Sequence, residues 1–420
     1  MDRRKAWEKL GAYQLPFEDD WALKLVQAAV VDTEVDELNI SQSNEDSSFV
    51  FRCSSPWSAE WLKDAFYKVD TRLEAGAEHL LIAVRSLALK RRTPFFLLFP
   101  NGDRLAWNGE EFQHLESSES SGTFTVLVTH YEFGASRSYF SADNRTAADT
   151  KERIARHLRS HCHFAPANIL LEGRPIANHL CDPVFGATES SENLALSKLS
   201  PHPELPNIEV LTCSRAGSAQ IGGINVTADS SLYAELIEND ALTECSAAVL
   251  LSVFWREEIA RRTLKLDKII TNHHQASSEL IWLKDGVVLD RESITSPQSL
   301  GVGILLSAEG LPTDLTGFRL LDNENRRSRR RWAMMAVSSF LEFSNPDKRC
   351  PVRLKSRKIG TVVKGVLGLG LVLATPVIGG LMLGGAGYDY KISQERETSL
   401  NEALKTAYDQ MIFELRGKAK

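Results

Sequence analysis

The chain has 420 residues, of which 43% are hydrophobic and 25% are charged, as in an ordinary globular protein. Its length favours two or three domains. The net charge is −6, but residues 326–364 carry twelve Lys or Arg against two acidic residues, so the remainder carries −16. An acidic body excludes general nucleic-acid binding. Six cysteines without a CxxC pair exclude a disulfide framework and are typical of a reducing compartment.

Residues 1–115 alternate between helical and strand patterns. Apolar residues recurring every three or four positions predict helices, at 2–15, 19–32, 58–69 (starting at Ser58) and 78–92. Residues 36–41 and 47–53 are predicted as two strands joined by a polar turn. The Asn101-Gly102 pair predicts a second hairpin, because this dipeptide accepts the left-handed backbone of a tight turn.

A second unit is predicted from about Ala147 onward. A strand is predicted at 123–133, before this unit. The unit itself has a helix at 150–164, strands at 167–173, 208–214 and 246–255, and a hairpin at 277–292 that turns at Asp285-Gly286. Helices that share each unit with hairpins indicate an α+β fold and not a parallel doubly wound sheet. The predicted segments are a first domain at 1–115, a connection at 116–146, a second domain at 147–325, a basic linker at 326–364, a membrane segment at 365–388 and a tail at 389–420.

Residues 365–388 contain no charged residue. A helix of this length, at ~1.5 Å per residue, crosses a hydrocarbon core of ~30 Å, so one C-terminal transmembrane helix is expected. The alternative is a buried, glycine-rich core segment. The basic excess at 326–364 predicts contact with the bilayer, a cytoplasmic body and a short tail outside; the alternative for 326–332 is a solvated helix start or a nucleic-acid patch. Gly380 and Gly384 are spaced for self-association of the span.

The tail at 393–418 has the pattern of an amphipathic helix. Its apolar stripe consists of Leu400, Leu404, Ala407, Met411 and Leu415. Three possibilities are open for this stripe. It packs on a partner or on the soluble body, it lies on a membrane face, or it belongs to a loosely ordered helix.

Two segments resemble the GHKL superfamily, and in particular the ninety-kilodalton heat-shock chaperones with an ATP-binding domain and a middle domain. LKLVQAAVVDTEVDELNIS (23–41) is similar to the first conserved helix, ELxxNAxDA, and SAEGLPTDLT (307–316) is similar to the DLPLNxSRE segment of the middle domain. The phrase HCHFAPANILLEGRPI (161–176) is similar to bacterial chaperone-like proteins. The resemblance covers about residues 1–330 and implies a GHKL-like domain followed by a middle-type domain.

The departures from that family point away from ATP hydrolysis. The family's catalytic Glu and magnesium-holding Asn correspond to Lys24 and Ala28, which can neither act as an acidic base nor ligate a hard cation. The adenine-binding DxGxG motif corresponds to VFRCSSPW (50–57), without Asp or Gly, and the glycine-rich lid to EAGAEHLLIAV (74–84), with Gly76 alone. The phosphate-stabilising Arg corresponds to Gly317.

Gln27 and Asp32 are the polar residues of this helix that could be remnants of a nucleotide pocket; the alternative is that they are ordinary surface positions. No catalytic residue and no resident cofactor are predicted, with ATP as the alternative. His157, His161, Cys162 and His163 invite a metal interpretation, but the run HLRSH lacks the Glu of HExxH and Arg156 and Arg159 flank it, so no metal is predicted. No GxxxxGK[ST], GxSxG or GxGxxG motif is present.

The sequence thus predicts a single-pass, membrane-anchored binding or scaffold protein on a degenerate chaperone-ATPase fold, a pseudo-ATPase with an unidentified protein partner or client. The first alternative is an active or nucleotide-sensing ATPase that uses substitute residues. The second alternative is a membrane effector whose glycine-rich span oligomerises.

Overall fold

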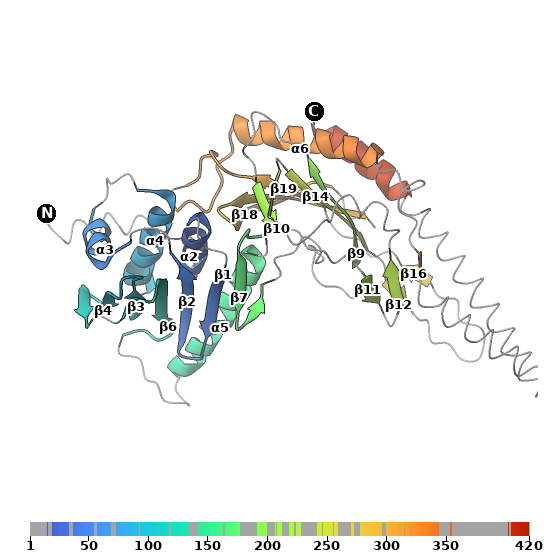
Figure 1. The fold of residues 1–420 in the computed structure, drawn as a ribbon. Helices are drawn as coiled ribbons and strands as arrows, with labels where there is room; N and C mark the ends of the chain where they lie inside the picture. The colour runs from blue at the N-terminus through green and yellow to red at the C-terminus, as the bar shows by residue number, and fades with distance from the viewer. Residues whose placement is uncertain are drawn as a thin grey trace, which may run out of the picture.

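A computed structural model of the chain shows two sheet-based units joined at one side (Figure 1). It describes residues 19–32, 37–53, 57–68, 73–91, 93–116, 119–133, 142–162, 164–176, 278–295, 300–314, 316–343 and 405–419, with single positions at 15, 206 and 402 and short strands between 191 and 272 and at 353–354.

The first unit is built on an eight-stranded sheet with the order β5-β4-β3-β6-β2-β1-β7-β8. Its strands are β1 (Glu37–Gln42), β2 (Asp46–Arg52), β3 (Phe95–Leu98), β4 (Arg104–Trp107), β5 (Phe112–Leu115), β6 (Thr123–Thr129), β7 (Asn168–Leu171) and β8 (Arg174–Pro175). Neighbouring strands are antiparallel except β1 and β7. Alternate residues of β2 and β6 are buried, the pattern of a sheet with one covered face.

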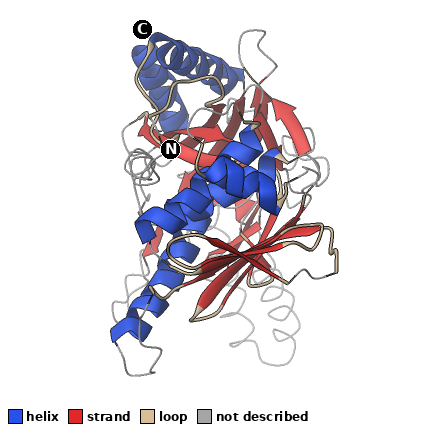
Figure 2. Ribbon diagram, turned by 90° about the vertical axis from the view of Figure 1, so that its left-hand side faces the viewer, coloured by secondary structure: helices blue, strands red, loops and turns tan. Residues whose placement is uncertain are grey.

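Helices cover that face of the sheet (Figures 1 and 2). They are α2 (Asp20–Val31), α3 (Ala59–Phe66) and α4 (Ala75–Ser86), which a π-helical turn η2 (Leu87–Arg91) continues, together with α5 (Ala142–His161), which packs beside α2. The Trp21 and Phe49 rings meet edge to face, with centroids 5.5 Å apart, and join α2 to β2. Apolar residues of all these elements share one core.

The second unit is built on a five-stranded sheet with the order β18-β17-β19-β14-β9. Its strands are β9 (Ser191–Leu199), β14 (Ala247–Phe254), β17 (Glu279–Lys284), β18 (Val287–Ser293) and β19 (Leu300–Ser307), with β17 and β19 parallel and the other pairs antiparallel. Three small sheets contain β10 (Ile208–Leu211) with β13 (Leu242–Cys245), β11 (Ser218–Ile221) with β12 (Ile224–Thr227) and β20 (Arg353–Leu354), and β15 (Arg256–Glu258) with β16 (Ile270–Asn272).

Several local predictions are confirmed, and the mixed helix and sheet content is consistent with the predicted α+β class. The strands β3 and β4 form a hairpin around Asn101-Gly102, where Gly102 has a φ of 92°. The strands β17 and β18 form another around Asp285-Gly286, with φ values of 50° and 75°. The helix predicted to start at Ser58 is α3, and the Ser58 hydroxyl caps it by accepting a hydrogen bond from the Trp61 amide at 3.2 Å.

The C-terminal tail packs on the body of the protein. Residues 405–419 form a helix beside α6 (Glu324–Phe343), and Ala407, Met411 and Leu415 are buried in the second core (Figure 1). Of the three possibilities for this stripe, packing on the soluble body is therefore the one that these residues show. Leu400 and Leu404 lie outside the described residues.

The predicted transmembrane helix is corrected. Among the described residues, no helix combines the length and the apolar character needed to cross a bilayer. Residues 365–388, with the Gly380/Gly384 pair, lie outside the described residues. The tail packing gives a physical reason for the correction, because α6 and the helix at 405–419 share one core. A single crossing between them would put two packed helices on opposite sides of the bilayer.

The arginines at the start of the predicted basic linker are part of helix α6 and contact the protein itself. Arg326 binds Asp290 and Glu292, and Arg330 approaches the same Glu292 at 3.1 Å. Arg329 donates to the carbonyl oxygens of Ser307 and Glu309 at 2.9 and 2.7 Å. Most of this positive charge therefore fixes α6 to the second sheet and its loops.

Candidate functional site

The two units meet on helix α2. Residues Asp20–Ala29 of this helix are all buried, including the polar residues Lys24 and Gln27. The tip of the β17–β18 hairpin and the loop at 316–318 cover the outer side of α2. A Cβ added to Gly286 at the hairpin tip would lie 3.0 Å from Val30, and Val287 and Phe318 of the second unit belong to the core of the first.

Lys24 lies at the centre of this junction. Its Nζ is 3.5 Å from His79 Nδ1 and 4.2 Å from the centroid of the Phe318 ring. A Cβ at Gly317 would lie 3.1 Å from the same Nζ, so the backbone at 317 passes directly over the ammonium group. Burial lowers the pKa of Lys24 from 10.5 to about 8, with the nearby Lys284 acting in the same direction and Asp285 opposing it.

His79 links Lys24 to the hairpin tip. Its Nε2 lies 2.8 Å from Asp285 Oδ2, so Nε2–H donates to the carboxylate and Nδ1 is the acceptor that faces the Lys24 ammonium. Burial lowers the pKa of His79, and the hydrogen bond to Asp285 opposes this shift. Gln27 Nε2 donates to the carbonyl oxygen of Lys284 at 3.1 Å, so two polar residues, Gln27 of α2 and His79 of α4, hold one hairpin tip.

The residues that the resemblance assigned to a nucleotide site make contacts within the protein. Gln27 donates a hydrogen bond to the Lys284 carbonyl at the hairpin tip. Asp32 is buried and accepts a hydrogen bond from Cys53 Sγ at 3.4 Å. A Cβ at Gly76 would lie 3.4 Å from the Ala28 carbonyl, so this glycine serves close packing of α4 on α2. The stretch at 50–57 includes the end of β2, with Phe51 in the core. Among the described residues of 50–57 and 74–84, no phosphate-binding loop is formed.

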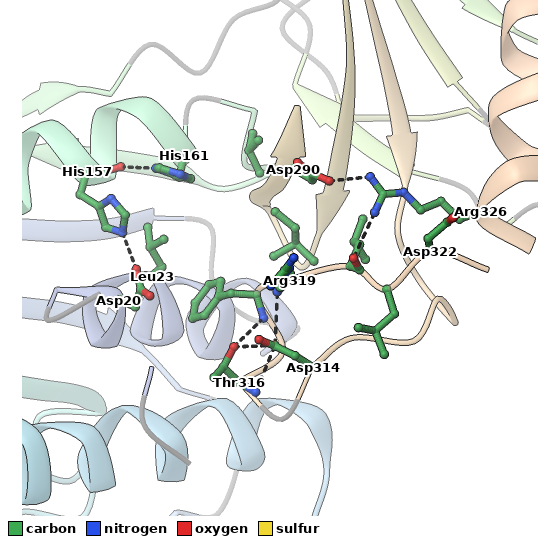
Figure 3. A pocket seen from close by; sticks show the side chains of 15 residues that line it. Asp20, Leu23, His157, His161, Asp290, Asp314, Thr316, Arg319, Asp322 and Arg326 are labelled. Carbon is green, nitrogen blue, oxygen red and sulfur yellow. Dashed lines mark hydrogen bonds and ion pairs between the residues drawn. The ribbon is translucent and has the colours of Figure 1, made fainter. Parts of the chain in front are cut away.

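A separate cleft of about 960 Å³ opens beside this junction (Figure 3). It lies between α2, the end of α5, β18 and the loop 314–322, and its lining comprises Asp20, Leu23, His157, His161, Val288, Leu289, Asp290, Asp314, Thr316, Phe318, Arg319, Leu320, Leu321, Asp322 and Arg326. Phe318 thus belongs both to the cleft and to the surroundings of Lys24.

Many of the polar groups of the cleft already bind one another. His157 Nε2 lies 2.8 Å from Asp20 Oδ1, which joins α5 to α2. Asp314 accepts from the Thr316 hydroxyl at 2.6 Å and from backbone amides of the same loop, and these hydrogen bonds hold its pKa below the usual range against the effect of burial. Arg326 is bound by Asp290 (Figure 3).

The predicted histidine pair is brought together on one face of α5. The His157 and His161 rings have centroids 4.4 Å apart. Cys162 is fully buried, which raises the pKa of its thiol well above the ordinary value, and His163 lies outside the described residues. Within the part of the chain that is described, no three His, Cys, Asp or Glu side chains are placed to hold a metal ion.

Sequence reasoning missed His79, Lys284 and Phe318 as members of the junction. The Asp285-Gly286 turn was visible as a local signal, but its contact with α2 joins residues 257 positions apart. The available signal was a lysine among the apolar residues of the predicted helix at 19–32, and it pointed to Lys24 but to none of its partners.

A comparison with protein-family models found no match, and a comparison with curated proteins found none either.

Proposed function

We propose that this chain is a binding or scaffold protein without ATP hydrolysis, in which a contact between two units takes the place of a nucleotide site. The observation that carries the proposal is the docking of the hairpin tip at 284–286 on α2. That tip is held by Gln27, His79 and packing against Val30. Such a protein acts by binding another protein, a partner or client whose identity is open.

The resemblance to chaperone ATPases belongs to this proposal. In that family the Glu of the first helix and the Arg of the middle domain act at the same terminal phosphate. The corresponding positions here are Lys24 and Gly317, and they lie against each other, with 3.1 Å between Nζ and a Cβ at 317. Their proximity supports the correspondence, while their chemistry supports the loss of hydrolysis. An ammonium cannot abstract a proton from water, and a glycine cannot stabilise phosphate charge.

The experiment measures thermal unfolding and phosphate release of the full chain with and without ATP and magnesium. We expect no shift of the melting temperature and no release above a blank, because Gln27 is bound to the hairpin tip and Asp32 is bound to Cys53. Stabilisation at ligand concentrations near 100 times Kd would add about 2.7 kcal/mol, which thermal unfolding detects easily.

Two variants separate the outcomes. Asp285→Ala removes the carboxylate that binds His79, and Asp103→Ala changes an exposed hairpin elsewhere in the first unit. Small-angle scattering should show an expanded particle for Asp285→Ala alone, with nucleotide having no effect on either. Stabilisation by ATP without turnover would make the protein a nucleotide sensor. Phosphate release that Lys24→Met abolishes would make it an ATPase, and either result rejects the proposal.

A further inference from the structure

The cleft between α2, α5, β18 and the loop 314–322 has the size and lining of a small-molecule site. Its volume of about 960 Å³ lies within the range of ligand pockets. Six apolar side chains line it: Leu23, Val288, Leu289, Phe318, Leu320 and Leu321. Leu321 is 44% exposed, so part of this apolar lining is open to an incoming ligand.

His161 supplies a hydrogen-bond acceptor to this cleft. Its Nδ1 lies 3.0 Å from the His157 carbonyl oxygen, which can only accept, and 2.7 Å from the Ser160 hydroxyl, which itself donates to that carbonyl. Both contacts are satisfied when the proton is on Nδ1. Nε2, at the opposite end of the ring, then carries a lone pair, and it has no hydrogen-bond partner among the described residues. Burial lowers the pKa of His161, which keeps this nitrogen unprotonated at neutral pH.

The lining has more carboxylates than guanidinium groups. Four aspartates and two arginines line the cleft, and their formal charges sum to −2. Arg326 is bound by Asp290 and Glu292, Asp322 is bound by Arg327 from outside the lining, and Arg319 is exposed. The groups that face His161 are His157 on its own helix, Asp20 on α2, and Arg291 on β18, whose guanidinium donates to the Ser160 carbonyl at 3.2 Å.

From these three features we infer that the cleft binds an ammonium-bearing ligand with an apolar or aromatic body. The apolar lining would cover the body, and the ammonium group would donate to His161 Nε2, with Asp20 as the carboxylate that faces this ring. Charge-assisted hydrogen bonds of this type are stronger than neutral ones and give the site its preference for amines. The cleft shares Phe318 with the surroundings of Lys24, but amine binding in it does not depend on the proposed loss of ATP hydrolysis.

The test uses two probes with the same indole body and opposite charge, tryptamine and indole-3-propionate. Histidine ring signals of the full chain are followed by NMR during titration at pH 7.5. Tryptamine should shift the His161 signal saturably, and indole-3-propionate should bind at least about tenfold more weakly, since one charge-assisted hydrogen bond is worth a factor of this size.

His161→Phe keeps an aromatic ring but removes the acceptor, and should weaken tryptamine binding about tenfold. His114→Phe, at an exposed position of β5 in the first unit, is the matched control and should change nothing. If the His161 variant does not fold, the pH dependence of the unmodified chain decides. Tryptamine binding should weaken as His161 becomes protonated below pH 6.5. Three results would overturn the inference. They are equal binding of the two probes, binding of neither probe, and tryptamine binding that neither His161→Phe nor acid weakens.

Discussion

Lys24 and Gly317 are separated by almost the whole length of the two units in sequence, yet the backbone at 317 lies directly over the Lys24 ammonium. A Cβ at 317 would be 3.1 Å from Nζ, and Gly317 has a φ of 73°. This contact joins the first helix of one unit to a loop of the other. The contact and the left-handed backbone together favour glycine at 317.

Gly317→Ala should destabilise the protein more than the same change at a comparable glycine. Gly122 also has a left-handed backbone, with a φ of 67°, but no atom lies within 4 Å of its added Cβ. Gly122→Ala should cost about 1 kcal/mol from the backbone alone. Gly317→Ala should cost roughly 1 kcal/mol more, because its methyl group meets Lys24. Urea unfolding compares the two, and equal losses would mean that the contact has no energetic weight.

Lys24→Met should stabilise the folded protein. Burial lowers the pKa of Lys24 to about 8, so the charged form is disfavoured in the folded state. We expect an apolar side chain of similar shape to raise the free energy of unfolding by about 1–2 kcal/mol, after loss of the contacts with Phe318 and His79. The exposed Lys68→Met, which breaks a surface pair with Asp64, serves as the control and should change little. A lower midpoint of urea unfolding for Lys24→Met would show that the ammonium is a net stabilising group.

The stability of the unmodified protein should also rise with pH in the alkaline range. The pKa of Lys24 is about 8 in the folded state and 10.5 as the ordinary value, so between these values the unfolded chain binds more protons. The free energy of unfolding therefore increases from pH 8 to 10.5. Lys24→Met should lack this increase in denaturant titrations, and an identical slope in both proteins would contradict the assignment.

Acidification should weaken the junction through His79. Its pKa is lowered by burial in the folded state, so the unfolded chain takes up a proton first as the pH falls below 6.5. Stability from the neutral imidazole is present above 6.5 and is lost as the pH falls towards the lowered folded value. His79→Gln should reduce the difference in unfolding free energy between pH 7.5 and 5.0. The exposed His114→Gln should leave that difference intact, and the prediction fails if both variants behave alike.

The tail helix should contribute to the core of the second unit. Met411 is fully buried and its Sδ accepts from the Ser278 hydroxyl at 3.7 Å, whereas Phe413 two positions later is 80% exposed. Met411→Ala should cost about 2–5 kcal/mol of unfolding free energy, and Phe413→Ala should cost little. Guanidinium unfolding followed by tryptophan fluorescence measures both, because Trp282 lies in the same core. A negligible effect of Met411→Ala would mean that the tail is not part of the folded unit.

The sequence by itself determined features that depend on neighbouring residues: the two tight turns, the start of a helix at Ser58 and the amphipathic stripe of the tail. Only the tertiary structure decided which surfaces these elements cover. It placed the Asp285 turn on α2 and the tail stripe on α6. The length and hydropathy rule that predicted a span at 365–388 considers one segment alone. The packing of 405–419 against α6 depends on contacts between segments distant in sequence, which no local pattern encodes.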